Sequence, residues 1–326
     1  MASFLDPAIL FFIFGAFAGA VKSNLEIPQP IARFLSLYLL MALGLKGGFA
    51  LHKSGFTAEI ALSLGLAVFL AILIPIVGYQ ILRTKLNAFD AAAIAATYGS
   101  VSAVTFITAT QYLDQFNISY GGHMAAAMAL MESPAIILAI LLANKARTAH
   151  ASQNQTQTQT QTQATGISKI LHESFTDGAQ LLLLGSMVVG LVSGDDGQKL
   201  MAPFSIDLFK GMLAFFLLDM GLMAARNIQG LQGKPPITLL YAIASPLSHA
   251  LIALALCKLI GLPLGNTILL MVLASSASYI AVPAVLRHAL PEVNPAIYMG
   301  MSLGITFPFN IILGIPLYAM IAKLVI

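Results

Sequence analysis

Two short clusters of small polar residues stand inside otherwise apolar segments of the chain. The first is Tyr98-Gly99-Ser100-Val101-Ser102, and the second is Ser275-Ser276-Ala277-Ser278, which is followed by Pro283. Glycine, serine and proline allow a helix to break, and the first N–H groups of the helix that resumes lack intrahelical partners and bind anions. Hydroxyl and N–H groups at two such breaks would surround a small anion without help from arginine.

A third candidate is Glu132, a carboxylate in an apolar segment that is followed by Ser133 and Pro134. An unpaired charge at the centre of a bilayer costs about 2.5–3.5 kcal/mol, so this side chain should face the protein interior. The carboxylate, with carbonyl oxygens freed by the proline, supplies the oxygen ligands that a hard cation prefers. We predict that Glu132 contributes to a Na⁺ site. The alternative is an internal ion pair, most simply with Lys46.

The elements that carry these residues must be membrane-spanning helices. Of 326 residues, 58% are hydrophobic and 9% are charged, whereas about a quarter of the residues in a soluble protein are charged. The uncharged segments Ile60–Leu82 and Leu259–Leu286 each exceed the roughly 20 residues that cross a bilayer as a helix. The chain is therefore predicted to be an all-α polytopic membrane protein, which excludes soluble enzymes, nucleic-acid binders and disulfide scaffolds.

Charges and Pro/Gly clusters divide the chain into ten predicted spans. They lie near residues 7–21, 34–51, 58–82, 90–112, 121–143, 174–193, 205–225, 236–257, 264–287 and 295–323. Most Lys and Arg residues fall in the loops on the face away from the termini, for example Arg33, Arg83 and Lys145. The positive-inside rule then predicts that the termini are outside and that the central loop is cytoplasmic.

The chain divides into two halves that resemble each other weakly. We predict a first five-helix repeat at 1–145, a cytoplasmic Gln/Thr-rich disordered linker at 146–172 and a second repeat at 173–326. Three matches occur at a nearly constant separation in sequence: Leu43–Leu45 with Met220–Leu222, Ser100 and Ser102 with Ser276 and Ser278, and Asn117 with Asn294. An odd number of spans per half makes the repeat inverted, so the fourth and ninth spans would be discontinuous helices that cross at the midplane.

Each small-residue cluster alone is also explained by close helix packing, because serine can bond a carbonyl of its own helix without any ligand. Their equivalent positions in the two halves favour a binding site. The sequence contains no GxSxG, HExxH, Walker or CxxC motif, and the single Cys257 lies in an apolar run. We therefore expect a protein that is not an enzyme and has no cofactor other than Na⁺ as a coupling ion.

With these residues the chain resembles the sodium-dependent bicarbonate transporter family, first known from cyanobacteria. The segments that carry the resemblance are LGLKGGFAL (43–51), YGSVSAVTF (98–106), ALMESPAII (129–137), MGLMAARNI (220–228), SSASYIAVPAVLR (275–287) and NPAIYMGMSLGITFP (294–308). The resemblance implies a gate domain, a core domain with crossed discontinuous helices, and a homotrimer. It also implies Na⁺-coupled bicarbonate symport across the plasma (inner) membrane by alternating access, with a small PII-like protein as a cytosolic regulator.

Carried over position by position, the resemblance places the anion at a set of residues in the two breaks. These are Gly99, Ser100, Val101, Ser102, Thr105, Ser275, Ser276 and Ser278. Glu132 would serve the sodium side. Two alternatives stay open: a Na⁺ symporter of another small carboxylate, and an anion channel or membrane sensor that couples nothing to Na⁺. A carrier saturates and requires Na⁺, a channel follows the gradient of the anion alone, and a sensor transports nothing.

Overall fold

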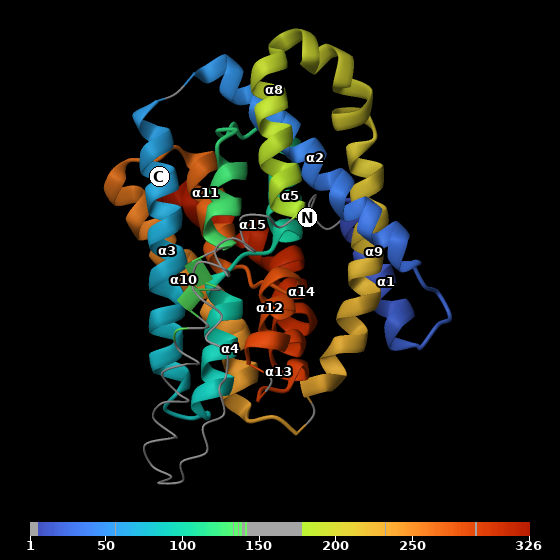
Figure 1. The fold of residues 1–326 in the computed structure, drawn as a ribbon, viewed down its shortest axis with the longest axis vertical. Coiled ribbons are helices and arrows are strands. Elements are labelled where there is room, and N and C mark those ends of the chain that lie inside the picture. The colour runs from blue at the N-terminus through green and yellow to red at the C-terminus, as the bar shows by residue number, and fades with distance from the viewer. Residues whose placement is uncertain are drawn as a thin grey trace.

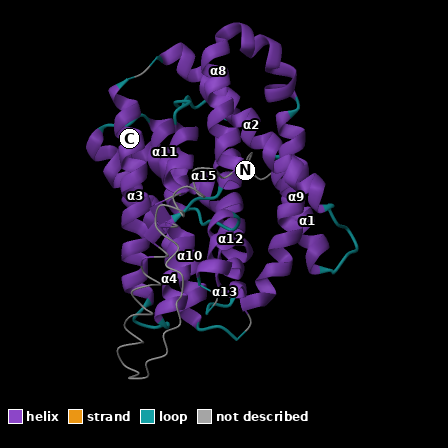
Figure 2. Cartoon of the chain, viewed as in Figure 1, coloured by secondary structure: helices purple, strands orange, loops and turns teal. Residues whose placement is uncertain are grey.

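The computed structural model of the chain describes residues 6–55, 57–132, 134–135, 137–138, 141, 178–231, 233–290 and 292–326. These residues form helices joined by loops, and within these ranges there is no strand (Figure 2). Six of the described helical segments are long and apolar enough to cross a membrane, as a multi-pass protein requires. The predicted linker at 146–172 lies outside the described residues, as does part of the predicted fifth span.

The helices of the first half fall where the apolar segments predicted them. They are α1 (Pro7–Ala20), α2 (Gln29–Ser54), α3 (Ala58–Leu82), α4 (Ala88–Gly99) and α5 (Ala103–Gln115), followed by a helix of which residues 124–132 are described without a gap. Local sequence explains several ends. The Asp6 side chain caps α1 by accepting a hydrogen bond from the Ala8 N–H at 2.9 Å, and Pro7 occupies the first helical position.

The second half begins with α8 (Gly178–Ala202), which bends at Gly194, where φ is +57°. The helices that follow are η2 (Pro203–Asp207), α9 (Phe209–Asn227), η3 (Ile228–Leu231), α10 (Pro236–Ile260), α11 (Leu264–Ser275) and α12 (Ala281–Ala289). A last helical stretch consists of α13 (Pro295–Met299), η4 (Gly300–Thr306), α14 (Phe307–Phe309), η5 (Asn310–Gly314) and α15 (Ile315–Val325). In η2, η4 and η5 the turns are π-helical, a local widening that composition did not predict.

Four helices, α1, α2, α8 and α9, form one group, which Figure 1 shows together on one side of the molecule. Within it α1 packs on α9 and α2 packs on α8, with glycines at both contacts. A Cβ atom on Gly221 would collide with the Phe12 carbonyl of α1, and one on Gly44 would collide with the Leu183 carbonyl of α8. The helix backbones therefore touch, as small residues allow in membrane proteins.

The remaining helices form a second group around α4 and α11. α3 packs against α4, α10 packs against α11, and α11 also contacts α5 and α15. Every residue from Ala91 to Gly99 and from Gly265 to Ser275 is buried. A helix that is buried all round lies at the centre of a bundle rather than on its surface. Both central helices end at the small-residue clusters, so the bundle holds those clusters in its interior.

A buried hydrogen-bond chain connects the end of α4 to α10 and η4 within the second group. Pro246 has no N–H, so the carbonyl of Ala242 one turn earlier in α10 lacks its usual helical partner. The Thr306 hydroxyl donates to this carbonyl at 2.7 Å and shares a 2.6 Å hydrogen bond with the Tyr98 hydroxyl. Thr306 thus satisfies two buried polar groups and joins α4, α10 and η4.

We expect Thr306→Val to lower the melting temperature of the purified protein clearly. Valine keeps the shape but leaves the Tyr98 hydroxyl and the Ala242 carbonyl buried without this partner, at a combined cost of about 2–4 kcal/mol. Thr108→Val is the matched control, because among the described residues the Thr108 hydroxyl bonds only the Val104 carbonyl of its own helix, at 2.9 Å. Equal melting temperatures for the two variants would contradict the role assigned to Thr306.

Candidate functional site

The two helix breaks meet in the interior of the second group. Between α4 and α5 the chain is extended at Ser100 and Ser102, and between α11 and α12 it is extended at Ser276. The backbone N–H of Ser102 donates to the Ser276 Oγ at 3.0 Å, and the backbone N–H of Ser278 donates to the Thr97 carbonyl at 2.8 Å. The second break is therefore held by one hydrogen bond to the first break and by another to the last turn of α4.

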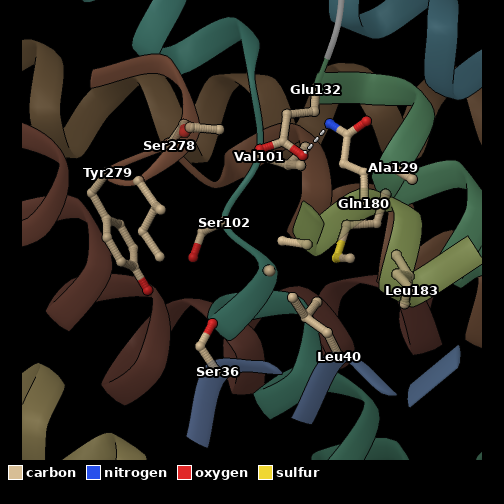
Figure 3. Close-up of a pocket in the computed structure, with 15 residues that line it drawn as sticks. Ser36, Leu40, Val101, Ser102, Ala129, Glu132, Gln180, Leu183, Ser278 and Tyr279 are labelled. Carbon is tan, nitrogen blue, oxygen red and sulfur yellow. Dashed lines mark hydrogen bonds between the residues drawn. The ribbon is translucent and has the colours of Figure 1, made fainter. Parts of the chain in front are cut away.

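A cavity of about 70 Å³, the central cavity, lies beside this crossing (Figure 3). Its wall is formed by both breaks, by α2, by the helix of residues 124–132 and by the start of α8. In Figure 3 the second break, with Ser278 and Tyr279, lies on one side of the cavity. The α8 helix, with Gln180 and Leu183, lies on the other side, and the first break, with Val101 and Ser102, lies between them. A water molecule needs about 10–15 Å³ of such space, so the cavity can hold a small ion with part of its hydration.

Two helix N-termini contribute to the wall of the central cavity. Ala103 is the first residue of α5, and Ala281 is the first residue of α12; both line the cavity. The first turn of a helix carries N–H groups without intrahelical partners and the positive end of the helix dipole. Because α5 and α12 both begin here, the electrostatic environment on this side of the cavity favours an anion.

Glu132 supplies the acidic side of the same cavity. Its side chain lines the wall, and its Oε2 accepts a hydrogen bond from the Gln180 amide at 2.6 Å (Figure 3). Lys46, the internal partner considered for Glu132, instead has its Nζ 3.3 Å from the Asp114 Oδ2, and this ion pair lines a different cavity. The central cavity thus combines a carboxylate with two helix N-termini.

Of the predicted anion-binding residues, Val101, Ser102 and Ser278 line the central cavity. Ser102 is the N-cap of α5, and its Oγ accepts from the Thr105 N–H at 3.1 Å. Ser278 lies two residues before Ile280, the N-cap of α12, and its Oγ accepts from the Val282 N–H in the first turn of that helix at 3.2 Å. Both serines therefore bond N–H groups of first turns that lack intrahelical partners.

The other predicted residues lie behind this wall and support it. Thr105 donates its hydroxyl to the Ser102 Oγ at 2.9 Å, and Ser276 donates to the Leu273 carbonyl at 2.9 Å while accepting from Ser102. Ser275 is fully buried, and its carbonyl accepts from the Asn310 amide at 2.9 Å. These three residues shape the crossing without lining the cavity.

Gly99 and Ser100 have different roles again. A Cβ atom on Gly99 would lie 2.6 Å from the Cγ of Pro75, so glycine is required for α4 to approach α3. The Ser100 hydroxyl is buried and has no hydrogen-bond partner among the described residues. Such a group is costly unless a ligand, ion or water satisfies it, so Ser100 stays a candidate ligand from behind the wall.

Sequence reasoning missed three polar residues that line the central cavity: Ser36 of α2, Gln180 of α8 and Tyr279 of the second break. The Tyr279 side chain is buried, and its hydroxyl lies toward the Ser102 hydroxyl (Figure 3). Tyr279 directly follows the second cluster in the sequence, so its position next to Ser278 was a usable signal. Ser36 and Gln180 lie in ordinary helices, and only helix packing brings them to the cavity.

Comparison with known proteins fits this arrangement. No curated protein matches the chain. A family model described as the Na⁺-dependent bicarbonate transporter superfamily matches residues 7–323, a range that contains both helix breaks and Glu132. A match over nearly the whole chain identifies the family, and the chain therefore belongs to the Na⁺-dependent bicarbonate transporter superfamily.

Proposed function

We propose that this chain is a secondary active transporter that carries bicarbonate into the cell together with Na⁺ by alternating access. The observation that supports this proposal best is the meeting of the α5 and α12 N-termini at one small cavity that also contains Glu132. Bicarbonate has a single charge and is small enough to be bound by N–H groups and by the hydroxyls of Ser102 and Ser278. No cofactor other than the coupling ion takes part.

The same geometry gives a reason for coupling. The Glu132 carboxylate repels an anion in the central cavity, and this repulsion is strong where little water screens it. A Na⁺ ion held by Glu132 cancels the repulsion and attracts the anion, so each ion raises the affinity for the other. Na⁺ binds first in this scheme, and the cavity that holds both ions carries less net charge through the low-dielectric part of the protein than a cavity that holds the anion alone.

The proposal includes the ten-helix inverted repeat with a gate domain and a core domain. It is supported by Gly44 and Gly221, which occupy matching places in the two halves of the sequence. Gly44 lets α2 contact α8, and Gly221 lets α9 contact α1. In an inverted repeat these two contacts are the same contact made twice, between the first span of one half and the second span of the other.

The remaining parts of the proposal concern the cellular setting. We place the protein in the plasma (inner) membrane with its termini outside and the 146–172 loop in the cytoplasm, because of the distribution of Lys and Arg. A homotrimer and regulation by a small PII-like cytosolic protein are implied by the family resemblance and stay predictions.

The test of this function is uptake of ¹⁴C-bicarbonate into proteoliposomes under an inward Na⁺ gradient, compared with an equal K⁺ gradient. We expect saturable uptake only with Na⁺. In the Ser100→Ala plus Ser276→Ala double variant we expect uptake to fall about tenfold or more, because the break loses both a candidate ligand and the bond to the Ser102 N–H.

Three other outcomes would change the proposal. Saturable Na⁺-dependent uptake of a different small carboxylate, with no bicarbonate uptake, would keep the symport and replace the substrate. Uptake that follows the anion gradient without Na⁺ would identify a channel. Unchanged uptake by the double variant, folded and inserted as shown by its melting temperature, would remove the anion site from the crossing.

A further inference from the structure

A second cavity lies along α2 on the side of Ser54, the end that the predicted orientation places outside the cell; we call it the outer cavity. Its volume is about 230 Å³, larger than that of the central cavity. It is enclosed by α2, α5 and the segment that leads into the helix of residues 124–132. Lys46 supplies the positive charge on its wall, and Asp114 supplies the negative charge.

The two cavities follow the same face of α2. The α2 residues that line one or the other include, in order, Ser36, Leu40, Leu43, Gly47 and Ala50. Their alternating spacing of three and four residues keeps them on a single helix face. With a rise of about 1.5 Å per residue, the α2 residues of the two cavities are centred about 13 Å apart along the helix.

The helix of residues 124–132 also lines both cavities with a single face. Ala125 lines the outer cavity, whereas Met128, Ala129 and Glu132 line the central one. These four residues also share one face of their helix. The cavities are therefore two widenings of one interface, between α2 of the first group and the helix of residues 124–132.

Apolar side chains close the interface between the widenings. Leu40 and Met128 face the central cavity, Leu43 and Phe106 face the outer cavity, and all four are buried. An apolar constriction of this kind excludes water and ions until the walls move apart.

An ion pair joins α2 to α5 at the outer cavity. Lys46 of α2 and Asp114 of α5 are separated by 3.3 Å, and 26% and 39% of their side chains are exposed. The Lys46 ammonium also lies 4.6 Å from the centroid of the Phe209 ring of α9. A partly exposed pair of this kind is weak, so it can hold two groups of helices together and still open within a transport cycle.

Building on the transport function proposed above, we infer that the outer cavity is an entrance to the transport path; we call this entrance the mouth. A small monovalent anion passes through it to reach the central cavity when the apolar constriction opens. The Lys46–Asp114 pair closes this mouth in the structure described here, and Lys46 offers the entering anion a counter-charge when the pair separates.

Single-cysteine labelling tests this inference with little background, because the native Cys257 is fully buried. The test variant is Ala50→Cys in the outer cavity. The control is Ala58→Cys, an exposed position at the same end of the bundle, at the start of α3 and outside the cavity. Both are treated in intact cells with an anionic, membrane-impermeant methanethiosulfonate.

We expect both positions to be labelled. Labelling should reduce Na⁺-dependent uptake about fivefold or more at position 50 and should leave uptake unchanged at position 58. Addition of Na⁺ with bicarbonate should change the labelling rate at position 50 only. Full uptake after labelling at position 50, or an equal ligand effect at both positions, would overturn the inference.

A second variant tests the ion pair without relying on transport. Asp114→Asn removes the partner of Lys46 and should raise the labelling rate at Ala50→Cys about threefold or more, because the mouth opens more often. An unchanged rate would overturn the closing role of the pair. The labelling rates need no uptake, so they judge the cavity even where bicarbonate uptake fails and the proposed function is rejected.

Discussion

Glu132→Gln is expected to reduce Na⁺-dependent bicarbonate uptake about tenfold or more at limiting Na⁺, a loss equivalent to about 1.4 kcal/mol or more. Glutamine keeps the size of the side chain and can still accept the 2.6 Å hydrogen bond from the Gln180 amide. Glutamine lacks the negative charge that binds Na⁺ and that makes binding of the anion depend on Na⁺. Initial rates measured over a range of Na⁺ concentrations should show a higher Na⁺ requirement.

Glu26→Gln provides the matched control, because Glu26 is an exposed carboxylate in the loop between α1 and α2. This variant should transport at the wild-type rate with the wild-type Na⁺ dependence. Glu132→Gln should also keep the wild-type melting temperature, which separates lost coupling from lost folding. A Glu132→Gln protein that retains full Na⁺ dependence would show that this carboxylate is not part of the sodium site.

Gly48→Ala is the substitution for which we expect the largest loss of stability. The new Cβ atom would collide with the Met187 carbonyl and would lie 2.7 Å from the Leu191 nitrogen, both in the backbone of α8. Backbone atoms cannot rotate away as a flexible side chain can, so α2 and α8 must separate. Overpacking of this kind costs about 3 kcal/mol or more, and the melting temperature in detergent should fall sharply.

The same change at Gly65 should have the opposite effect. Gly65 lies inside α3, and an added Cβ atom there meets no atom within 4 Å. Alanine is favoured over glycine inside a helix by about 0.5–1 kcal/mol, so Gly65→Ala should be neutral or slightly stabilising. Similar melting temperatures for the two variants would refute the close contact between α2 and α8.

The helix breaks could be predicted from sequence because they depend on local chemistry. Gly99 and the serines that follow cannot easily continue a helix, and Ser102 is a strong N-cap residue for the helix that resumes. The α3 helix was predicted at its observed bounds, 58–82, because charged and polar residues end it on both sides. Membership of a transporter family also confirms the prediction that the chain is not an enzyme.

The composition of the cavity wall could not be predicted in the same way. Whether Thr105 faces the cavity or supports Ser102 depends on the rotation of α5, which is set by packing in the whole bundle. Gln180 reaches Glu132 only because α8 lies beside the helix of residues 124–132. The partner of Lys46 is Asp114, more than sixty residues away in sequence, and no local pattern indicates that pairing.

The contact between α2 and α8 also limits how these helices can move. Gly44 and Gly48 are spaced by four residues, and each lies against the backbone of α8 with no side chain between. A slide by a fraction of a turn would bring a larger side chain to the place that a glycine now occupies. The next register without a collision at that place lies a full turn away, about 6 Å along the axis. The α2 and α8 helices can therefore slide past each other only in steps of about one turn, and smaller displacements must occur at other interfaces.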